Sequence, residues 1–208
     1  MDITDGRIHG LKVIDPRVFA DDRGWFCETF SAHRYTAAGI DHTRFVQDNH
    51  SRSRQRVIRG LHTRSELRES KLVRCARGTV FDVAVDLRPW SPTFLQWQGF
   101  ELDDRAHRQL LIPPGCAHGF QALSPIADVC YRVDAYYDPT MQLAIRWNDP
   151  DLAIPWPLED PVLSDKDRAA PTLADVRDHF ARWYGTREPD DINPGCVHVN
   201  GDAQLGGR

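Results

Sequence analysis

Short segments in which hydrophobic and polar positions alternate dominate the first 140 residues of the chain and predict β-strands. The clearest runs from Thr79 to Leu87, TVFDVAVDL, where apolar side chains alternate with a set that includes two aspartates. One face carries Phe81, Val83, Val85 and Leu87, and the other carries Val80, Asp82, Ala84 and Asp86. The pattern allows an inner face that bears carboxylates. Of two roles for the aspartates, binding a sugar or pairing with Arg74 and Arg88, we favour the pairing.

Further segments of this kind are separated by Gly, Pro and Asp residues, which are typical of turns. They are residues 11–14, 25–30, 72–75, 97–102, 109–112, 119–123 and 129–136. Many short strands at this spacing favour a β-sandwich or a barrel.

Helical patterns are few and lie at the edges of the strand pattern. One is predicted over residues 32–38 and a stronger one over residues 173–184. Thr172 can cap the second helix, with Asp175 in its first turn. Its apolar stripe, which we expect to pack outside the sheets, consists of Leu173, Val176, Phe180 and Trp183.

The composition fits one globular domain that binds neither nucleic acid nor a membrane. With 208 residues, 41% of them hydrophobic, the chain can bury roughly 70% of the surface that it exposes when unfolded. A net charge of −4 argues against a general nucleic-acid binder, and no run of eighteen apolar residues occurs. We expect a single domain over residues 1–186 and a polar, flexible tail over residues 187–208.

The cysteines favour a reducing compartment. There are five, at positions 27, 75, 116, 130 and 196, and no two form a Cys-x-x-Cys pair, so neither a disulfide framework nor a thiolate zinc site is indicated. The first ten residues carry acids in place of the basic and apolar parts of a leader. A cytoplasmic protein is therefore predicted, and Cys116 is interpreted as a packed thiol.

A base and a cation stand close together in the sequence. Arg59-Gly60-Leu61-His62 is followed nine residues later by Lys71, at the head of an apolar strand. An imidazole can take a proton from carbon, and a nearby ammonium can hold the oxyanion that this step creates. From residue 52 to residue 77 there are nine Lys or Arg residues against two acids, Glu66 and Glu69. These residues indicate carbanion chemistry on an anionic carbonyl compound.

Two further motifs limit the choice of cofactor. The segment from Pro113 to His118 reads Pro-x-Gly-x-x-His, the second half-motif of the cupin jelly roll. Metal-binding cupins carry His-x-His in the first half-motif, whereas this chain reads His62-Thr63-Arg64, so a cation replaces a ligand. No Gly-x-Gly-x-x-Gly is present for a nicotinamide nucleotide. We expect no metal and no cofactor.

Taken together, the motifs resemble the dTDP-4-dehydrorhamnose 3,5-epimerase family, whose members act on nucleotide 4-keto-6-deoxy sugars. The resemblance covers residues 10–176. It is carried by DRGWFCETF, FVQDNHSRS, RGLH, KLVRCARGTVFDVAVDLRPWSPTF, IPPGCAHGF, IRWNDPDLAIPW and LSDKD, and by the surroundings of Tyr131 and Tyr137. It implies an all-β, cupin-type jelly-roll β-sandwich with a few peripheral helices, mainly C-terminal.

The resemblance also implies a mechanism without a metal. His62 matches the family's general base, and Asp167 matches the carboxylate that orients it. Tyr131 matches the general acid across the sugar ring, and Lys71 matches the cation beside the carbonyl oxygen. The implied substrate contacts are Arg23, Phe26, Glu28, Gln47, Asn49, Arg59, Arg64, His118, Tyr137, Gln142 and Lys166. A homodimer is implied as well, with Arg23 and Glu28 reaching the site of a partner subunit.

The residue types suit this chemistry independently of the family. A ketone at carbon 4 acidifies the hydrogens at carbons 3 and 5, so inversion needs a base on one face, an oxyanion partner and a proton donor opposite. His62, Lys71 and Tyr131 supply these groups. The expected activity is cofactor-independent epimerisation, at carbon 3, carbon 5 or both, of a nucleotide-linked 4-keto-6-deoxyhexose in deoxysugar biosynthesis.

Thr63, Arg64 and Gln142 depart from the family pattern and leave the nucleotide base and the sugar open. The choice between single and double inversion also stays open, because both reactions use the same base. Arg64 could accept a further anionic group on the substrate. Two alternatives also stay open. One is a metal-dependent cupin enzyme that uses His62 and His118 with Glu66 or Glu69. The other is a noncatalytic module that binds nucleotide sugars.

Overall fold

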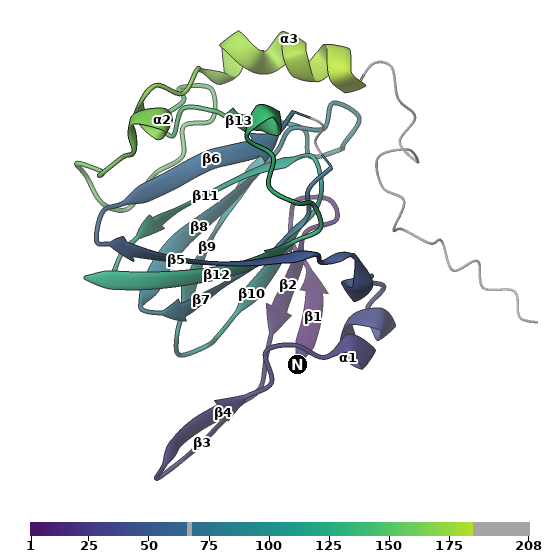
Figure 1. The fold of residues 1–208 in the computed structure, drawn as a ribbon, viewed down its shortest axis with the longest axis vertical. Helices are drawn as coiled ribbons and strands as arrows, with labels where there is room; N and C mark the ends of the chain where they lie inside the picture. Colours follow the sequence, from purple (N-terminus) through teal and green to yellow (C-terminus); the bar gives the residue numbers. More distant parts are fainter. Residues whose placement is uncertain (66–67, 185–208) are drawn as a thin grey trace, which may run out of the picture.

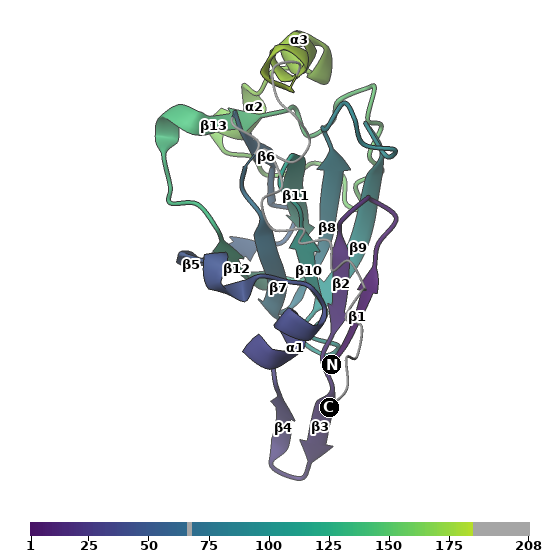
Figure 2. The same cartoon turned by 90° about the vertical axis from the view of Figure 1, so that its right-hand side faces the viewer.

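Two antiparallel β-sheets packed face to face make up most of the computed structural model, which describes residues 1–65 and 68–184 (Figures 1 and 2). The six-stranded sheet has the order β1-β2-β10-β7-β12-β5, and the five-stranded sheet has the order β13-β6-β11-β8-β9. The strands of the six-stranded sheet are β1 (Asp2–Asp5), β2 (Lys12–Asp15), β5 (Gln47–Arg54), β7 (Lys71–Arg77), β10 (Gln109–Ile112) and β12 (Ile126–Val133). Those of the five-stranded sheet are β6 (Ile58–Arg64), β8 (Thr79–Asp86), β9 (Trp97–Asp103), β11 (Cys116–Ala122) and β13 (Gln142–Ala144). The predicted all-β jelly-roll sandwich is confirmed.

Strand β8 separates two apolar clusters, as its alternation predicts. Val80 and Ala84 lie in the core between the sheets, together with residues such as Val73 and Leu110 of the opposite sheet. The outward side chains of β8, among them Val83, pack in a second cluster under the C-terminal segment. Because both faces of the five-stranded sheet are covered, β8 is buried from Asp82 to Asp86.

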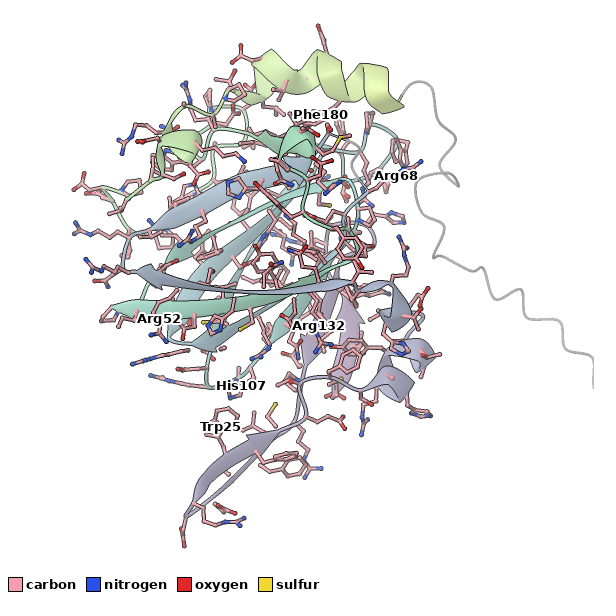
Figure 3. All side chains as sticks on the ribbon, viewed as in Figure 1. Trp25, Arg52, Arg68, His107, Arg132 and Phe180 are labelled. Atoms are coloured by element: carbon pink, nitrogen blue, oxygen red, sulfur yellow. The ribbon has the colours of Figure 1, made fainter. Side chains whose placement is uncertain are left out.

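Helix α3 (Leu173–Tyr184) covers the outer face of the five-stranded sheet, as predicted. Thr172 and Asp175 form the expected capping box: the Asp175 N–H donates to Thr172 Oγ1 at 3.3 Å, and the Thr172 N–H donates to the Asp175 carboxylate at 2.9 Å. Leu173, Val176 and Phe180 pack against the sheet, and Figure 3 shows Phe180 beneath the helix. The side chain of Trp183 and the predicted tail lie outside the described residues.

The remaining helices are short: α1 (Ala32–Ala37), η1 (His42–Arg44), η2 (Pro139–Met141) and α2 (Asp165–Arg168). Helix α1 begins at its Ser31 cap and lays the buried Tyr35 against Ile14 and Leu72 on the outer face of the six-stranded sheet. It lies where a helix was predicted. Helix α2 was not predicted. None of the described helices is long and apolar enough to cross a membrane.

A two-stranded hairpin, β3 (Val18–Asp21) with β4 (Gly24–Cys27), projects from the body of the sandwich (Figures 1 and 2). The strand predicted over residues 25–30 ends at Cys27, because the chain turns there toward the Ser31 cap of α1. On the hairpin, the centroid of the Trp25 ring lies 4.0 Å from that of the His107 ring (Figure 3).

The observed bounds of two other strands also differ from the predicted ones. The strand predicted over residues 129–136 begins at Ile126 and ends at Val133, and the one predicted over residues 119–123 begins at Cys116. Strands β1, β3, β5, β6 and β13 were not predicted. Strand β5 has the sequence QDNHSRSR, which lacks any apolar alternation. It forms because β12 pairs with it along its whole length.

Two glycines bring β6 and β11 close together near the middle of the five-stranded sheet. A Cβ atom on Gly60, which has φ +146°, would lie 2.5 Å from the Gly119 Cα. The register of the two strands shifts at the same point, between His118 and Phe120, and places His62 opposite His118. The close approach therefore sets two histidines side by side.

Candidate active site

His62 faces the interior of the sandwich. Its neighbour Leu61 packs in the outer cluster, and so does Ala117, the neighbour of His118. Successive side chains of a strand point to opposite faces, so His62 and His118 share the inner face.

Asp167 holds the His62 ring in the predicted way. His62 Nε2 lies 2.5 Å from Asp167 Oδ1, although 105 residues separate the two positions. Asp167 is 3% exposed, and the hydroxyl of Ser164, the N-cap of α2, donates to its second oxygen at 2.9 Å. Burial alone would raise the pKa of Asp167, but the hydrogen bond and charge of His62, with smaller contributions from Ser164 and Lys166, place the pKa below its usual value. An ionised Asp167 can stabilise an imidazolium, and Nδ1 is the ring nitrogen left to take a proton in this orientation.

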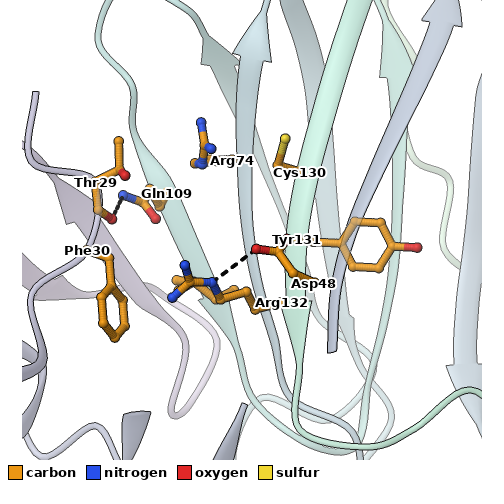
Figure 4. Close-up of a pocket in the computed structure, with 9 residues that line it drawn as sticks. Thr29, Phe30, Asp48, Arg74, Gln109, Cys130, Tyr131 and Arg132 are labelled. Carbon is orange, nitrogen blue, oxygen red and sulfur yellow. Dashed lines mark hydrogen bonds and ion pairs between the residues drawn. The ribbon is translucent and has the colours of Figure 1, made fainter. Parts of the chain in front are cut away.

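A second histidine–aspartate pair lies next to the first. His118 Nε2 lies 2.8 Å from Asp82 Oδ2, and both side chains are buried. The predicted partner of Asp82 was therefore wrong, because Arg74 projects from the other face of the six-stranded sheet (Figure 4). The pairing of Asp86 with Arg88, at 2.8 Å, is confirmed. Sequence reasoning left Asp82 out of the site, although the alternation of β8 had placed it on an inner face.

Lys71 begins β7 with its ammonium paired to a carboxylate. Its Nζ lies 3.2 Å from Glu69 Oε2, and both side chains are 11% exposed. Lys71 is thus largely removed from water, together with a partner that the sequence did not assign. No periodic pattern covers residues 65–70, so only the tertiary contact identifies Glu69.

Tyr131 faces the interior from β12, on the sheet opposite His62. Its neighbours across the ladders are Asn49 and Val73, and its ring packs against the central core. Figure 4 shows the phenol pointing away from Asp48 and Arg74, which lie on the outer face. Burial raises the pKa of Tyr131, and the negative charge of Glu69 adds to the effect while Arg59 opposes it. The phenol is therefore a proton carrier at neutral pH.

Polar groups from β5, from β6 and from the connection after β12 lie around the Tyr131 side of the sandwich. Gln47 Nε2 donates to Asn49 Oδ1 at 2.8 Å, and the Tyr137 N–H donates to Gln47 Oε1 at 3.1 Å. Arg59 Nε donates to Ser53 Oγ at 3.0 Å. Tyr137 is 65% exposed and offers its ring to solvent. These groups are suited to holding a polar ligand.

Arg64 and Gln142 face each other across the β6–β13 ladder. Arg64 is only 6% exposed, and its Nη1 donates to the Tyr136 carbonyl at 2.9 Å. This bond ties the guanidinium to the chain next to Tyr137. That Arg64 binds a further anionic group of the substrate stays a hypothesis.

Four predicted site residues lie away from the interior of this chain. Arg23 and Phe26 belong to the projecting hairpin, where Arg23 pairs with Asp21 at 2.6 Å and Phe26 is 68% exposed. Glu28 follows the hairpin and pairs with Arg34. Lys166 is exposed on α2, beside Asp167. Within one chain the structure does not bring these side chains to His62.

The groups on the inner faces of the two sheets are of the kinds that proton transfer requires. A histidine with an ionised carboxylate, an ammonium and a protonated phenol are the base, oxyanion partner and acid that enolate chemistry requires. Among the residues that the structure describes, no group of three or more His, Cys, Asp or Glu side chains is arranged to hold a metal ion. Glu66 lies outside those residues. Burial raises the pKa of the Cys116 thiol to about 12, which agrees with a packed thiol.

Comparisons with known proteins give one consistent result. A sequence model of the family described as dTDP-4-dehydrorhamnose 3,5-epimerase matches residues 5–175. A dTDP-4-dehydrorhamnose 3,5-epimerase of Pseudomonas aeruginosa is 49% identical over 85% of this chain and 98% of its own length.

Solved structures agree. A dTDP-6-deoxy-D-glucose-3,5-epimerase of Legionella pneumophila Philadelphia 1, in complex with dTDP-4-keto-L-rhamnose, superposes with a TM-score of 0.81. It is 48% identical, over 86% of this chain and 96% of that one. NovW, a 4-keto-6-deoxy sugar epimerase from Streptomyces spheroides, superposes with a TM-score of 0.82 at 40% identity, over 86% of this chain and 90% of that one.

Proposed function

Because the chain belongs to the dTDP-4-dehydrorhamnose 3,5-epimerase family, we propose that it inverts carbon 3, carbon 5 or both of a nucleotide-linked 4-keto-6-deoxyhexose in deoxysugar biosynthesis. The observation that carries the proposal is the His62–Asp167 hydrogen bond on the inner face of one sheet, with Tyr131 on the inner face of the other. A flat enolate between the sheets would then meet a base on one side and an acid on the other.

The proposed reaction begins when His62 removes the proton from the carbon next to the ketone. The electrons of the C–H bond form a double bond to carbon 4, and the carbonyl π electrons move onto its oxygen. The Lys71 ammonium stabilises the enolate oxygen that results. The Tyr131 phenol then returns a proton to the opposite face of the same carbon. Imidazolium and phenolate recover their resting forms by exchange with solvent. Asp167 holds the His62 ring and offsets the positive charge that it gains.

Exchange with solvent tests this function directly. In deuterium oxide the protein should place deuterium at the inverted carbons of dTDP-4-keto-6-deoxyglucose, as followed by proton NMR. His62→Ala should abolish exchange, and Tyr131→Phe should slow inversion more than proton removal, because the base is still present. Full deuterium incorporation by His62→Ala would refute the assigned base. A panel of nucleotide 4-keto sugars in the same assay identifies the substrate and the number of inverted carbons.

The metal-dependent alternative is tested separately. Both histidines named for it already bond to aspartates, His62 to Asp167 and His118 to Asp82. A stoichiometric transition metal in the purified protein, with activity lost to a chelator, would support that alternative.

The cytoplasmic location expected from the sequence stays a prediction.

We further propose that the protein is a homodimer in which the β3–β4 hairpin of one subunit completes the site of the other. Phe19, Trp25 and Phe26 on the hairpin are 50%, 57% and 68% exposed, an unusual amount of apolar surface for a hairpin that projects into solvent. The substrate contacts assigned to Arg23 and Phe26 require such an arrangement, because neither reaches the interior of its own chain.

Mixing two inactive variants tests the exchange of hairpins. A subunit with Arg23→Ala keeps His62 and can receive an intact hairpin from a subunit with His62→Ala. Co-refolded mixtures should therefore regain activity that neither variant has alone. Mixtures without any gain, or a monomer in light scattering, would contradict the proposal.

A further inference from the structure

Glu69 and Lys71 form an ion pair at the start of β7, in a place where both charges are largely removed from water. The carboxylate oxygen lies 3.2 Å from the ammonium nitrogen, and each side chain is 11% exposed. Burying two charges is costly even when they attract each other. Neither the proposed mechanism nor the assigned substrate contacts give Glu69 a role.

The backbone around Glu69 is fixed by hydrogen bonds. The N–H of Ser70, between the two charged residues, donates to Asp134 Oδ1 at 2.6 Å. The Asp134 side chain is 2% exposed, and Arg44 of η1 lies 3.3 Å from its other oxygen. Lys71 itself is paired in the ladders with Ile112 and Val133. The Glu69 carboxylate is thus held at a defined position relative to β12.

The negative charge of Glu69 acts electrostatically on the Tyr131 phenol. It adds to burial in raising the pKa of that phenol, while Arg59 acts in the opposite direction. Other charged or titratable groups that face the interior in the described part of the chain include Lys71 from β7, His62 and Arg64 from β6, His118 from β11, and Asp82 and Asp86 from β8. Strand β5 contributes the neutral Asn49 opposite Tyr131. A single carboxylate therefore touches one member of the proposed machinery and acts electrostatically on another.

We propose that Glu69 is a positioning residue of the active site, which holds the Lys71 ammonium at the oxyanion position and presents its negative charge toward the Tyr131 side of the interior. The inference rests on the proposed function, because it gives Glu69 a task only if Tyr131 is the proton donor. Glu69 acts through these two groups and forms no bond to the substrate.

Glu69→Gln keeps the size of the side chain and removes its charge. The alkaline limb of the rate of inversion should move to lower pH, since the phenol then loses its proton more easily. The turnover number should fall at pH values above the new limb, with a smaller effect on KM. Glu69→Asp should return the limb toward its original position, because it restores the charge. Glu101→Gln, which removes an exposed acid on β9, is the matched control and should leave the limb in place.

A direct titration separates this inference from the proposed function. The near-ultraviolet absorbance of tyrosinate, taken as the difference between each protein and its Tyr131→Phe counterpart, follows the Tyr131 phenol without substrate. Glu69→Gln should titrate at lower pH than the unmodified protein. An unchanged titration and an unchanged limb would overturn the role of Glu69 even if the enzyme is an epimerase. Failure of the unmodified protein to exchange deuterium with any 4-keto sugar would instead refute the proposed function.

Discussion

Replacing Asp167 by asparagine should be more damaging than replacing it by alanine, because the structure dictates how the amide must lie. Ser164 Oγ donates a hydrogen bond to Asp167 Oδ2, and His62 Nε2 meets Oδ1. An asparagine would turn its oxygen toward the Ser164 hydroxyl and its NH2 group toward His62. The imidazole would then accept at Nε2 and carry its proton on Nδ1, so the nitrogen that must act as base would already be protonated.

The two substitutions differ in magnitude. Asp167→Ala removes a charge-assisted hydrogen bond worth about 1.5–3 kcal/mol, which corresponds to a loss of roughly 10- to 150-fold in turnover. Asp167→Asn also fixes the wrong tautomer, so the loss should approach the full contribution of a general base, up to about 10⁴-fold. The order of the two losses is therefore the diagnostic quantity.

The assay is the initial rate of deuterium incorporation in heavy water, with thermal unfolding as a check that each variant folds. Ser164→Ala combined with Asp167→Asn is the matched control, because without the serine hydroxyl the amide can turn its oxygen back to His62. Exchange should recover relative to Asp167→Asn alone. A smaller loss in Asp167→Asn than in Asp167→Ala, or no recovery in the double variant, would refute this account of the pair.

Three further predictions concern stability. Burial raises the pKa of the Cys116 thiol from 9.0 to about 12, so the neutral thiol stabilises the fold fully below pH 9 and this contribution is lost as pH rises toward 12. Between those pH values the free energy of unfolding, measured with urea, should fall less steeply for Cys116→Ala than for the unmodified protein, by about 1.4 kcal/mol per pH unit. Equal slopes would contradict the raised pKa of Cys116. Thr172→Ala removes the hydroxyl that accepts the hydrogen bond of the Asp175 N–H, and should lower the free energy of unfolding by about 1 kcal/mol. Thr172→Ser keeps a hydroxyl and should retain most of this stabilisation. Gly60→Ala places a Cβ 2.5 Å from the Gly119 Cα, so urea unfolding should show a loss of roughly 1–3 kcal/mol, and an unaltered midpoint would show that β6 and β11 can move apart.

The sequence alone determined the class of the fold and the most regular elements. Strand β8 and helix α3 were predicted because each carries a periodic apolar pattern that matches one local geometry, and α3 also carries its own cap. The motif around His62 and the half-motif ending at His118 were recognisable because their residues are close together along the chain. Local signals of this kind need no knowledge of the tertiary structure.

The tertiary structure decided what the sequence could not express locally. The polar strand β5 exists because β12 pairs with it, and its own side chains show no preference for a strand. The partners of Asp82 and Lys71 are His118 and Glu69, set by the register of neighbouring strands and by one short connection. Hydrogen bonds and ion pairs depend on distance in space, and contacts across many residues leave no periodic trace in the chain that forms them.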